Sequence, residues 1–281
     1  MSKPTSCRWT AGLAPIDGAG NIYANVLEAF LAIMPPAAQA HLEVAREAGR
    51  LLARSIVCAD RVIDGDLTYG SFGENVLAAQ ICQLDAVRLL QRLVPADHEF
   101  WSAFASRLRE LADACLAELA DTERDVAAAE RIALGKNAVA RLAASLACVL
   151  GGTAEPLAEL DRAVVELIAA VQALDDAADW RADLARGQLS LVTARIWMQL
   201  GRDATGTAVD VFVYRVALPE VLHAGRTALE NAMTMPALRG SAAWTRMTGK
   251  IAHAYDHAIA VLPFREARPD RSSGAIEEAA Q

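Results

Sequence analysis

Two groups of aspartates, more than a hundred positions apart, carry the side chains best suited to chemistry in this chain. The first group contains Asp60 and Asp64, and the second contains Asp175, Asp179 and Asp183. Within each group the carboxylates are four residues apart, so on a helix they project from the same face. Two such faces opposite each other could bind several cations through oxygen alone, a ligand set that favours Mg²⁺, Mn²⁺ or Ca²⁺ over zinc.

The apolar stripes of the two segments indicate which way these carboxylates point. Val164 and Ile168 belong to a stripe whose next members include Asp175, and Ile56 lies on the face that Asp60 extends. Carboxylates buried without partners would take up protons, and divalent cations remove that cost. Either group by itself could consist of solvent-exposed aspartates at the end of a helix, but two groups that both face inward favour a metal site.

At these residues the chain resembles the class I isoprenoid synthases, which include trans-prenyltransferases, class I terpene cyclases, and squalene or phytoene synthases. Segment 60–64 resembles their first aspartate-rich motif, DxxxD, and segment 172–179 resembles the second, FQxxDDxxD. Lys136 is similar to the lysine of their Lys-Thr element, which contacts diphosphate. The resemblance covers roughly residues 40 to 200.

The resemblance implies an allylic prenyl diphosphate as substrate and about three Mg²⁺ ions as cofactors, with Mn²⁺ as an alternative. Its catalytic residues would be Asp60, Asp64, Asp175 and Asp179, and Asp183 would join these four as a metal ligand. The residues expected to bind the substrate are Lys136, Gln172, Arg186 and Arg215. A satisfied core amide remains an equal alternative for Gln172, because buried amides normally find partners.

Three departures from the family pattern bear on the reaction. Arg61 stands where the second aspartate of DDxxD would be, the segment 66–70 lacks the paired arginines of chain-elongating prenyltransferases, and their N-terminal Gly-Lys-x-x-Arg-Pro element is missing. The resemblance therefore implies a class I terpene synthase, a carbon–oxygen lyase that ionises one prenyl diphosphate and cyclises or quenches the cation. The alternatives are a chain-elongating or head-to-head (squalene/phytoene-type) prenyltransferase and a non-catalytic protein that binds prenyl diphosphates.

The elements that must position these side chains are expected to be helices. Hydrophobic residues make up 54% of the chain and aromatic residues 5%, and apolar residues recur at helical spacing almost throughout. We predict an all-α, single-domain bundle of about nine to eleven helices around a central cavity, spanning residues 19–264. An extension (1–18) would precede it and a disordered tail (265–281) would follow. The expected helices are 21–34, 37–64, 73–93, 97–127, 128–150, 156–184, 188–200, 205–233 and 240–262.

Composition also limits the partners and the compartment. A net charge of −8 argues against nucleic acid, and charges interrupt every apolar run before it could span a membrane. The five cysteines show no paired spacing, which is typical of free thiols in a reducing compartment. No secretory signal is visible, so we expect a cytoplasmic protein. Surplus apolar helix faces hint at a homodimer.

Other possible sites have weaker support. His253 and His257 have HxxxH spacing that could bind zinc, but further ligands are missing. The segment 220–223 matches half of a di-iron motif whose second half is absent. Trp101 and Trp180 are expected to pack rather than to stabilise a cation.

Overall fold

The computed structural model describes residues 20–65, 70–120, 122 and 124–262. In this part of the chain the regular structure is helical and there is no strand, as predicted. The α-helices are α1 (Gly20–Leu31), α2 (Pro36–Gln39), α3 (Leu42–Asp64), α4 (Phe72–Leu90), α5 (Phe100–Ala120), α6 (Val126–Lys136), α7 (Leu142–Gly151), α8 (Leu157–Arg186), α9 (Leu191–Leu200), α10 (Thr207–Phe212), α11 (Leu218–Met233) and α12 (Ala242–Val261). Shorter turns are η2 (Ala138–Arg141), the π-helical η3 (Val213–Ala217) and η4 (Pro236–Leu238).

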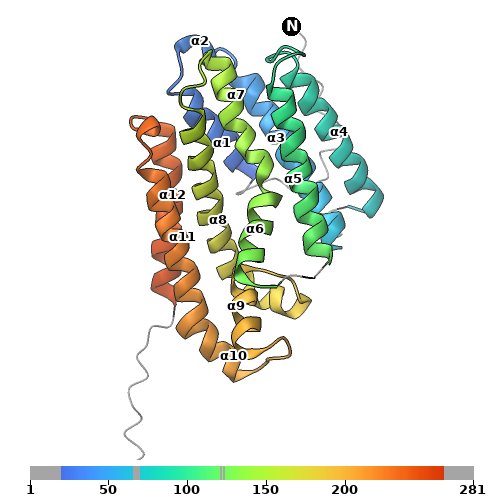
Figure 1. The fold of residues 1–281 in the computed structure, drawn as a ribbon, viewed down its shortest axis with the longest axis vertical. Helices are drawn as coiled ribbons and strands as arrows, with labels where there is room; N and C mark the ends of the chain where they lie inside the picture. The colour runs from blue at the N-terminus through green and yellow to red at the C-terminus, as the bar shows by residue number, and fades with distance from the viewer. Residues whose placement is uncertain (1–19, 66–69, 121, 123, 263–281) are drawn as a thin grey trace, which may run out of the picture.

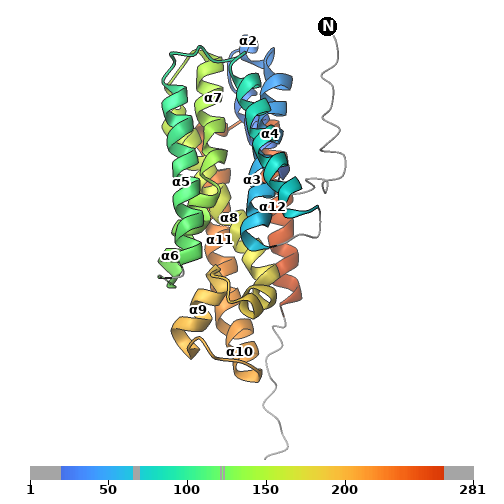
Figure 2. The same cartoon turned by 90° about the vertical axis from the view of Figure 1, so that its right-hand side faces the viewer.

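The helices form an elongated bundle, and α9 and α10 lie at the end opposite α2 (Figures 1 and 2). The 30-residue helix α8 runs along the bundle and packs against α11, α7 and α6. Its residues Leu160, Val164 and Leu167 are fully buried in the main apolar core. A second apolar cluster, which includes Trp180 and Trp197, joins α8 and α9 to η3 and α11.

Three expected helices are divided in the structure, and one of them, 205–233, consists of α10, the π-helical η3 and α11. The segment 128–150 consists of α6 and α7, which are bent by 56° at a break around Asn137. The side-chain amide of Asn137 donates to the Ala133 carbonyl at 2.9 Å, and such local bonds compete with the continuing helix. The expected helix 37–64 likewise separates into α2 and α3.

Helices α8 and α11 approach each other closely at Gly225. A methyl group built on Gly225 would lie 2.0 Å from the Tyr255 hydroxyl and 2.5 Å from Cβ of Ala173. That hydroxyl donates to the Ala170 carbonyl at 2.6 Å, so α12 is bonded to α8 beside this contact. The absence of a side chain at Gly225 therefore lets three helices meet at one point.

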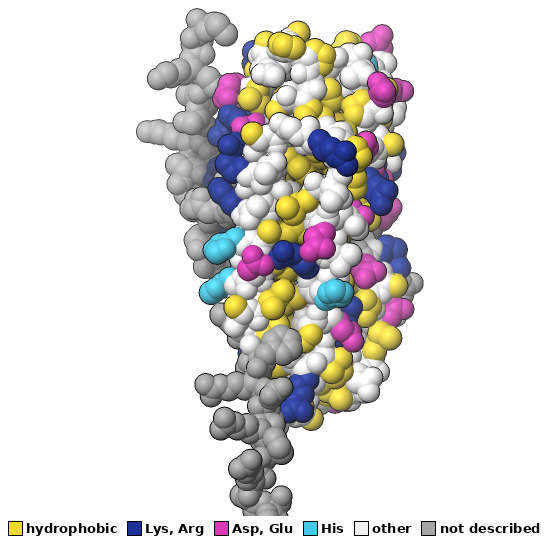
Figure 3. Space-filling view, turned by 90° about the vertical axis from the view of Figure 1, so that its left-hand side faces the viewer, with side chains coloured by type: hydrophobic (Ala, Val, Ile, Leu, Met, Phe, Trp, Pro, Cys, Tyr) yellow, Lys and Arg dark blue, Asp and Glu magenta, His cyan; other side chains and the backbone are white. Residues whose placement is uncertain are grey.

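In the described residues no single helix has both the length and the hydropathy needed to cross a membrane, although the bent pair α6–α7 passes that test jointly. One face of the molecule carries charged side chains of both signs scattered among hydrophobic ones (Figure 3). The expected extension 1–18 and tail 265–281 lie outside the described residues.

Candidate active site

A cavity of about 370 Å³ lies between α3, α5, α6, α8 and the turn before α9. We call it the acidic pocket, because carboxylates from three of these helices line it. Its apolar walls include Ile56, Val57, Ile132, Leu167, Ile168 and Val171. The pocket therefore combines a polar part, which could bind a charged group, with an apolar part, which could enclose a hydrocarbon.

Lys136 joins two walls of the acidic pocket. Its ammonium group lies 2.8 Å from a carboxylate oxygen of Asp60 on α3 and 2.9 Å from one of Glu118 on α5. Glu118 was not anticipated from the sequence, because a single glutamate near the end of an amphipathic helix carries no recognisable spacing. The structure thus brings the predicted residues Asp60 and Lys136 together and adds Glu118 to them.

The position of Lys136 depends on close packing between α5 and α6. A methyl group on Gly135 would lie 2.6 Å from Cβ of Ala114, so the glycine allows α6 to approach α5. Burial by itself lowers the pKa of Lys136, but the charges of Asp60 and Glu118 outweigh this effect. The pKa of Lys136 consequently lies above its ordinary value, and the side chain is a cation at neutral pH.

The three predicted carboxylates of α8 all line the acidic pocket, but they differ in exposure. Asp175 and Asp179 are exposed, whereas Asp183 is buried. The carboxylates at the first two positions therefore face an open pocket mouth rather than the sealed interior that their apolar stripe suggested. Desolvation has the largest effect on the pKa of Asp175 and raises it above its ordinary value. The like charges of Asp179, Asp183 and Asp60 raise it further. A bound cation would relieve that repulsion.

Asp183 lies at the edge of the pocket, where its carboxylate is paired with neighbouring side chains. Its carboxylate lies 3.1 Å from the guanidinium of Arg186, and it also has a hydrogen bond with Ser190. Desolvation raises the pKa of Asp183, and these two bonds oppose the rise. The predicted substrate-binding residue Arg186 therefore lines the acidic pocket as the partner of a predicted metal ligand.

Asp176 is a buried carboxylate whose role the sequence did not reveal. It accepts hydrogen bonds of 2.6 Å from the side-chain amide of Gln172 and from the backbone N–H of Leu191, the first residue of α9. Burial raises the pKa of Asp176 to about 6, against the effect of both bonds. Asp176 therefore fixes the start of α9 against α8, and Gln172 is a satisfied amide, which agrees with the alternative to substrate binding. The spacing of Gln172 and Asp176, four residues apart, was a signal that could have found this pair.

Two of the predicted residues are not placed in the pocket. Arg215 lies exposed in η3 and does not line the acidic pocket, so its assignment to the substrate remains a prediction without support from the geometry. The Asp64 side chain lies outside the described residues, although α3 ends at Asp64.

The exposure of the two histidines and the packing of the two tryptophans bear on the weaker alternatives from the sequence. His253 and His257 are exposed on α12. Trp180 is buried with its ring edge against Tyr214, and Trp101 forms an aromatic group with Phe104, so both tryptophans pack as expected.

The acidic pocket suits a hard divalent cation by the chemistry of its donors. Asp60 on one side and Asp175 and Asp179 on the other offer only carboxylate oxygen. Among the described side chains, no three His, Cys, Asp or Glu residues are already close enough to form a metal site. Water and the oxygens of a diphosphate commonly complete the coordination of Mg²⁺, so a few protein carboxylates suffice.

No protein-family model and no curated relative matches the chain, whereas several solved structures do. Octaprenyl pyrophosphate synthase from Helicobacter pylori is 12% identical, with a TM-score of 0.69 over 86% of this chain and 90% of that one. Geranylgeranyl pyrophosphate synthetase from Geoglobus acetivorans is 15% identical, with a TM-score of 0.66 over 83% and 85%. A polyprenyl synthase from Caulobacter crescentus, complexed with calcium and isoprenyl diphosphate, is 17% identical, with a TM-score of 0.56 over 94% and 86%.

These likenesses show that the chain has the isoprenoid synthase fold, as its aspartate-rich motifs predicted. The three proteins are named as synthases of prenyl chains rather than as terpene cyclases. The similarity therefore agrees with the prenyltransferase alternative better than with the terpene synthase that the missing arginines favoured.

Proposed function

We propose that this chain is an enzyme that ionises an allylic prenyl diphosphate with the help of divalent cations. The observation that carries the proposal is the acidic pocket itself. Carboxylates from α3 and α8 and the cation of Lys136 surround one part of it, and apolar side chains line the rest. A ligand with an anionic head and a hydrocarbon tail matches both parts.

Each group of residues has a distinct role in this proposal. Asp60, Asp175 and Asp179 would hold Mg²⁺ or Mn²⁺, which when bound neutralises charge on the diphosphate leaving group. Lys136 would turn its ammonium toward a diphosphate oxygen and stabilise the charge that develops as the C–O bond breaks. Asp176 would keep α9, and with it Ser190, in place at the edge of the pocket.

The apolar walls would control the carbocation once it has formed. Val57 from α3, Ile132 from α6 and Ile168 from α8 line the pocket from three helices and contain no group that could attack a carbocation. They would exclude water and hold the prenyl chain in one conformation until the cation reacts.

Two fates of the cation are candidates. Transfer to a second prenyl diphosphate is favoured by the solved structures with this fold, which are named as polyprenyl, octaprenyl and geranylgeranyl synthases. Cyclisation or quenching is favoured by the segment 66–70, which lacks the paired arginines expected for isopentenyl diphosphate. The ionisation step is common to both reactions.

Incubation of the purified protein with Mg²⁺ and geranyl, farnesyl or geranylgeranyl diphosphate, with and without isopentenyl diphosphate, tests the proposal. Diphosphate release from the allylic substrate by itself identifies a lyase, and a lengthened product that needs isopentenyl diphosphate identifies a prenyltransferase. Binding of all three substrates without any release would instead identify a non-catalytic binding protein.

A further inference from the structure

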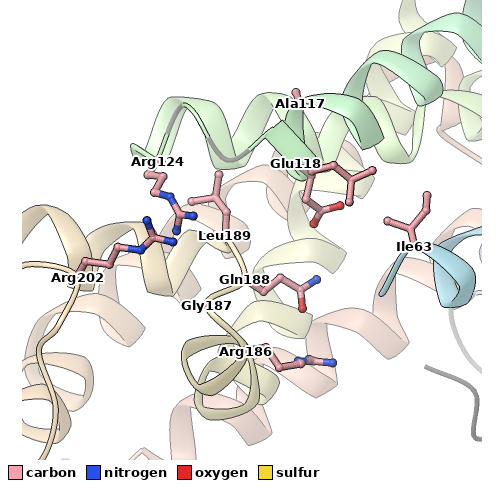
Figure 4. Close-up of a pocket in the computed structure, with 10 residues that line it drawn as sticks. Ile63, Ala117, Glu118, Arg124, Arg186, Gly187, Gln188, Leu189 and Arg202 are labelled. Atoms are coloured by element: carbon pink, nitrogen blue, oxygen red, sulfur yellow. The ribbon is translucent and has the colours of Figure 1, made fainter. Parts of the chain in front are cut away.

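Glu118 is a carboxylate to which the proposed function gives no role. Its side chain is 12% exposed, although its neighbours Ala117 and Leu119 on α5 are exposed. It lines the acidic pocket and also an adjoining cavity of about 310 Å³, into which its carboxylate points (Figure 4). Because a glutamate is rarely buried without a partner, the cation to which Glu118 is bonded indicates what it does.

That cation is Lys136, whose ammonium group lies 2.9 Å from a carboxylate oxygen of Glu118. Arg186 also lines both cavities, but its guanidinium group is 3.1 Å from the carboxylate of Asp183. Glu118 is thus bonded to the same lysine that contacts Asp60 on another wall of the acidic pocket.

Two further arginines line the adjoining cavity, and they lie away from Glu118 in Figure 4. Arg124 and Arg202 are both packed on Trp197, which is buried in α9. The central guanidinium carbon is 4.7 Å from the indole ring centroid for Arg124 and 5.9 Å for Arg202. These two side chains therefore have a stacking surface on α9, and the ion pair of Glu118 is made with α6.

The ammonium group of Lys136 is shared between two carboxylates from different helices. It has three N–H donors, and it lies 2.8 Å from Asp60 on α3 and 2.9 Å from Glu118 on α5. Because the ammonium group is tetrahedral, two such bonds fix the direction of the third donor. Without Glu118, a metal ion that binds Asp60 would have to displace the lysine from the last of these two carboxylates.

We propose that Glu118 is a positioning residue that retains Lys136 in the acidic pocket when a divalent cation replaces the lysine at Asp60. A dication beside Asp60 repels the ammonium group, and the negative charge of Glu118 offsets this repulsion. Lys136 then stays close enough to the metal site to reach a diphosphate oxygen. The exchange of partners at Lys136 does not depend on turnover, whereas its use in ionisation rests on the proposed function.

Isothermal titration of the full chain with Mn²⁺, in the absence of substrate, tests this exchange in a double-mutant cycle of Glu118→Gln and Lys136→Met. Glu118→Gln keeps the size of the side chain and removes its charge. Lys136 should then stay on Asp60, and Mn²⁺ should bind roughly fivefold or more weakly than to the wild type. In the Lys136→Met background the same substitution should change Mn²⁺ affinity by less than about twofold, because no ammonium group remains to be retained.

Glu130→Gln is the matched control, because Glu130 is exposed on α6 and lines neither cavity. This variant also loses one negative charge, and it should bind Mn²⁺ like the wild type. Glu118→Asp provides a second variant at the same position. Because it keeps the charge, it should bind Mn²⁺ more tightly than Glu118→Gln. Circular dichroism should show the helical content of the wild type in every variant.

Equal weakening by Glu118→Gln in both backgrounds, no weakening in either, or no Mn²⁺ binding to the wild type would overturn the proposal. The release of diphosphate from allylic prenyl diphosphates tests the use of this exchange in the reaction. The maximal rate should fall roughly tenfold in Glu118→Gln, and by less than about twofold when the substitution is added to Lys136→Met. The expected coupling in Mn²⁺ binding, in a protein that releases no diphosphate, would reject the proposed function and support the positioning of Lys136 by Glu118.

Discussion

The ammonium group of Lys136 lies 2.8 Å from a carboxylate oxygen of Asp60, so a lysine of α6 neutralises the first aspartate of the motif on α3. Glu118 accepts from the same ammonium group at 2.9 Å. A cation that binds at Asp60 must therefore compete with Lys136, and a diphosphate that arrives with it offers the lysine a new partner. This exchange would couple metal binding to substrate binding.

Replacement of Lys136 tests this relationship. We expect Lys136→Met to reduce the initial rate of diphosphate release by roughly 100-fold or more, because a donor aimed at developing negative charge is lost. Lys136→Arg should retain more activity, since the charge remains. Lys250→Met, at an exposed position on α12, should behave as the wild type. Equal rates for Lys136→Met and Lys250→Met would remove Lys136 from the mechanism.

The metal-binding role of α8 is tested at Asp175. Asp175→Asn keeps the size of the side chain but removes a charge, so the variant should need a higher Mg²⁺ concentration for half-maximal rate and reach a lower maximum. Titration of the rate with Mg²⁺ measures both quantities. Asp113→Asn on the exposed face of α5 is the control, and its Mg²⁺ curve should match the wild type. A wild-type curve for Asp175→Asn would contradict the assignment.

Asp176 is predicted to act on stability. Asp176→Ala leaves the backbone N–H of Leu191 and the amide of Gln172 without their acceptor, at a cost of roughly 1–3 kcal/mol in the free energy of unfolding. Urea denaturation in EDTA at pH 8 would measure it without interference from metal. Asp179→Ala, on the exposed side of the same helix, should change the value by less than about 0.5 kcal/mol. A larger loss of stability in Asp179→Ala than in Asp176→Ala would show that Asp176 does not anchor α9.

The contact at Gly225 predicts a pair of opposite effects. Gly225→Ala forces a methyl group against the Tyr255 hydroxyl and Ala173, which should destabilise the protein by roughly 1–3 kcal/mol. Gly249→Ala has open space around it in α12 and should stabilise the protein by up to about 1 kcal/mol, because alanine favours helix. Thermal unfolding of both variants checks the prediction, and a neutral Gly225→Ala would show that α8 and α11 are packed less closely in solution.

Much of this fold could be predicted because helix periodicity is a local property. The stripe that contains Val164 and Ile168 identified α8, and its continuation placed Asp175 at the pocket. The break at Asn137 was missed, because alanine and leucine on both sides carry the helical pattern across it. A hydrogen bond from a polar side chain to a carbonyl of its own helix does not alter the hydropathy pattern of the sequence.

The candidate site was predictable only where its residues share a helix or a motif. Lys136 and Glu118 meet because Gly135 lets α6 approach Ala114 on α5, and such a contact depends on packing between distant segments. The stacking of Arg124 and Arg202 on Trp197 was hidden for the same reason, because the two arginines come from different loops.

The most direct test of the acidic pocket as an active site is the release of diphosphate from allylic prenyl diphosphates, measured for the wild type and for Asp60→Asn and Asp175→Asn. We predict release by the wild type that requires Mg²⁺ or Mn²⁺, stops in EDTA and falls by roughly 100-fold or more in each variant. Circular dichroism should show the same helical content in all three proteins. Release that continues undiminished in both folded variants, or in EDTA, would contradict the assignment of the acidic pocket as the active site.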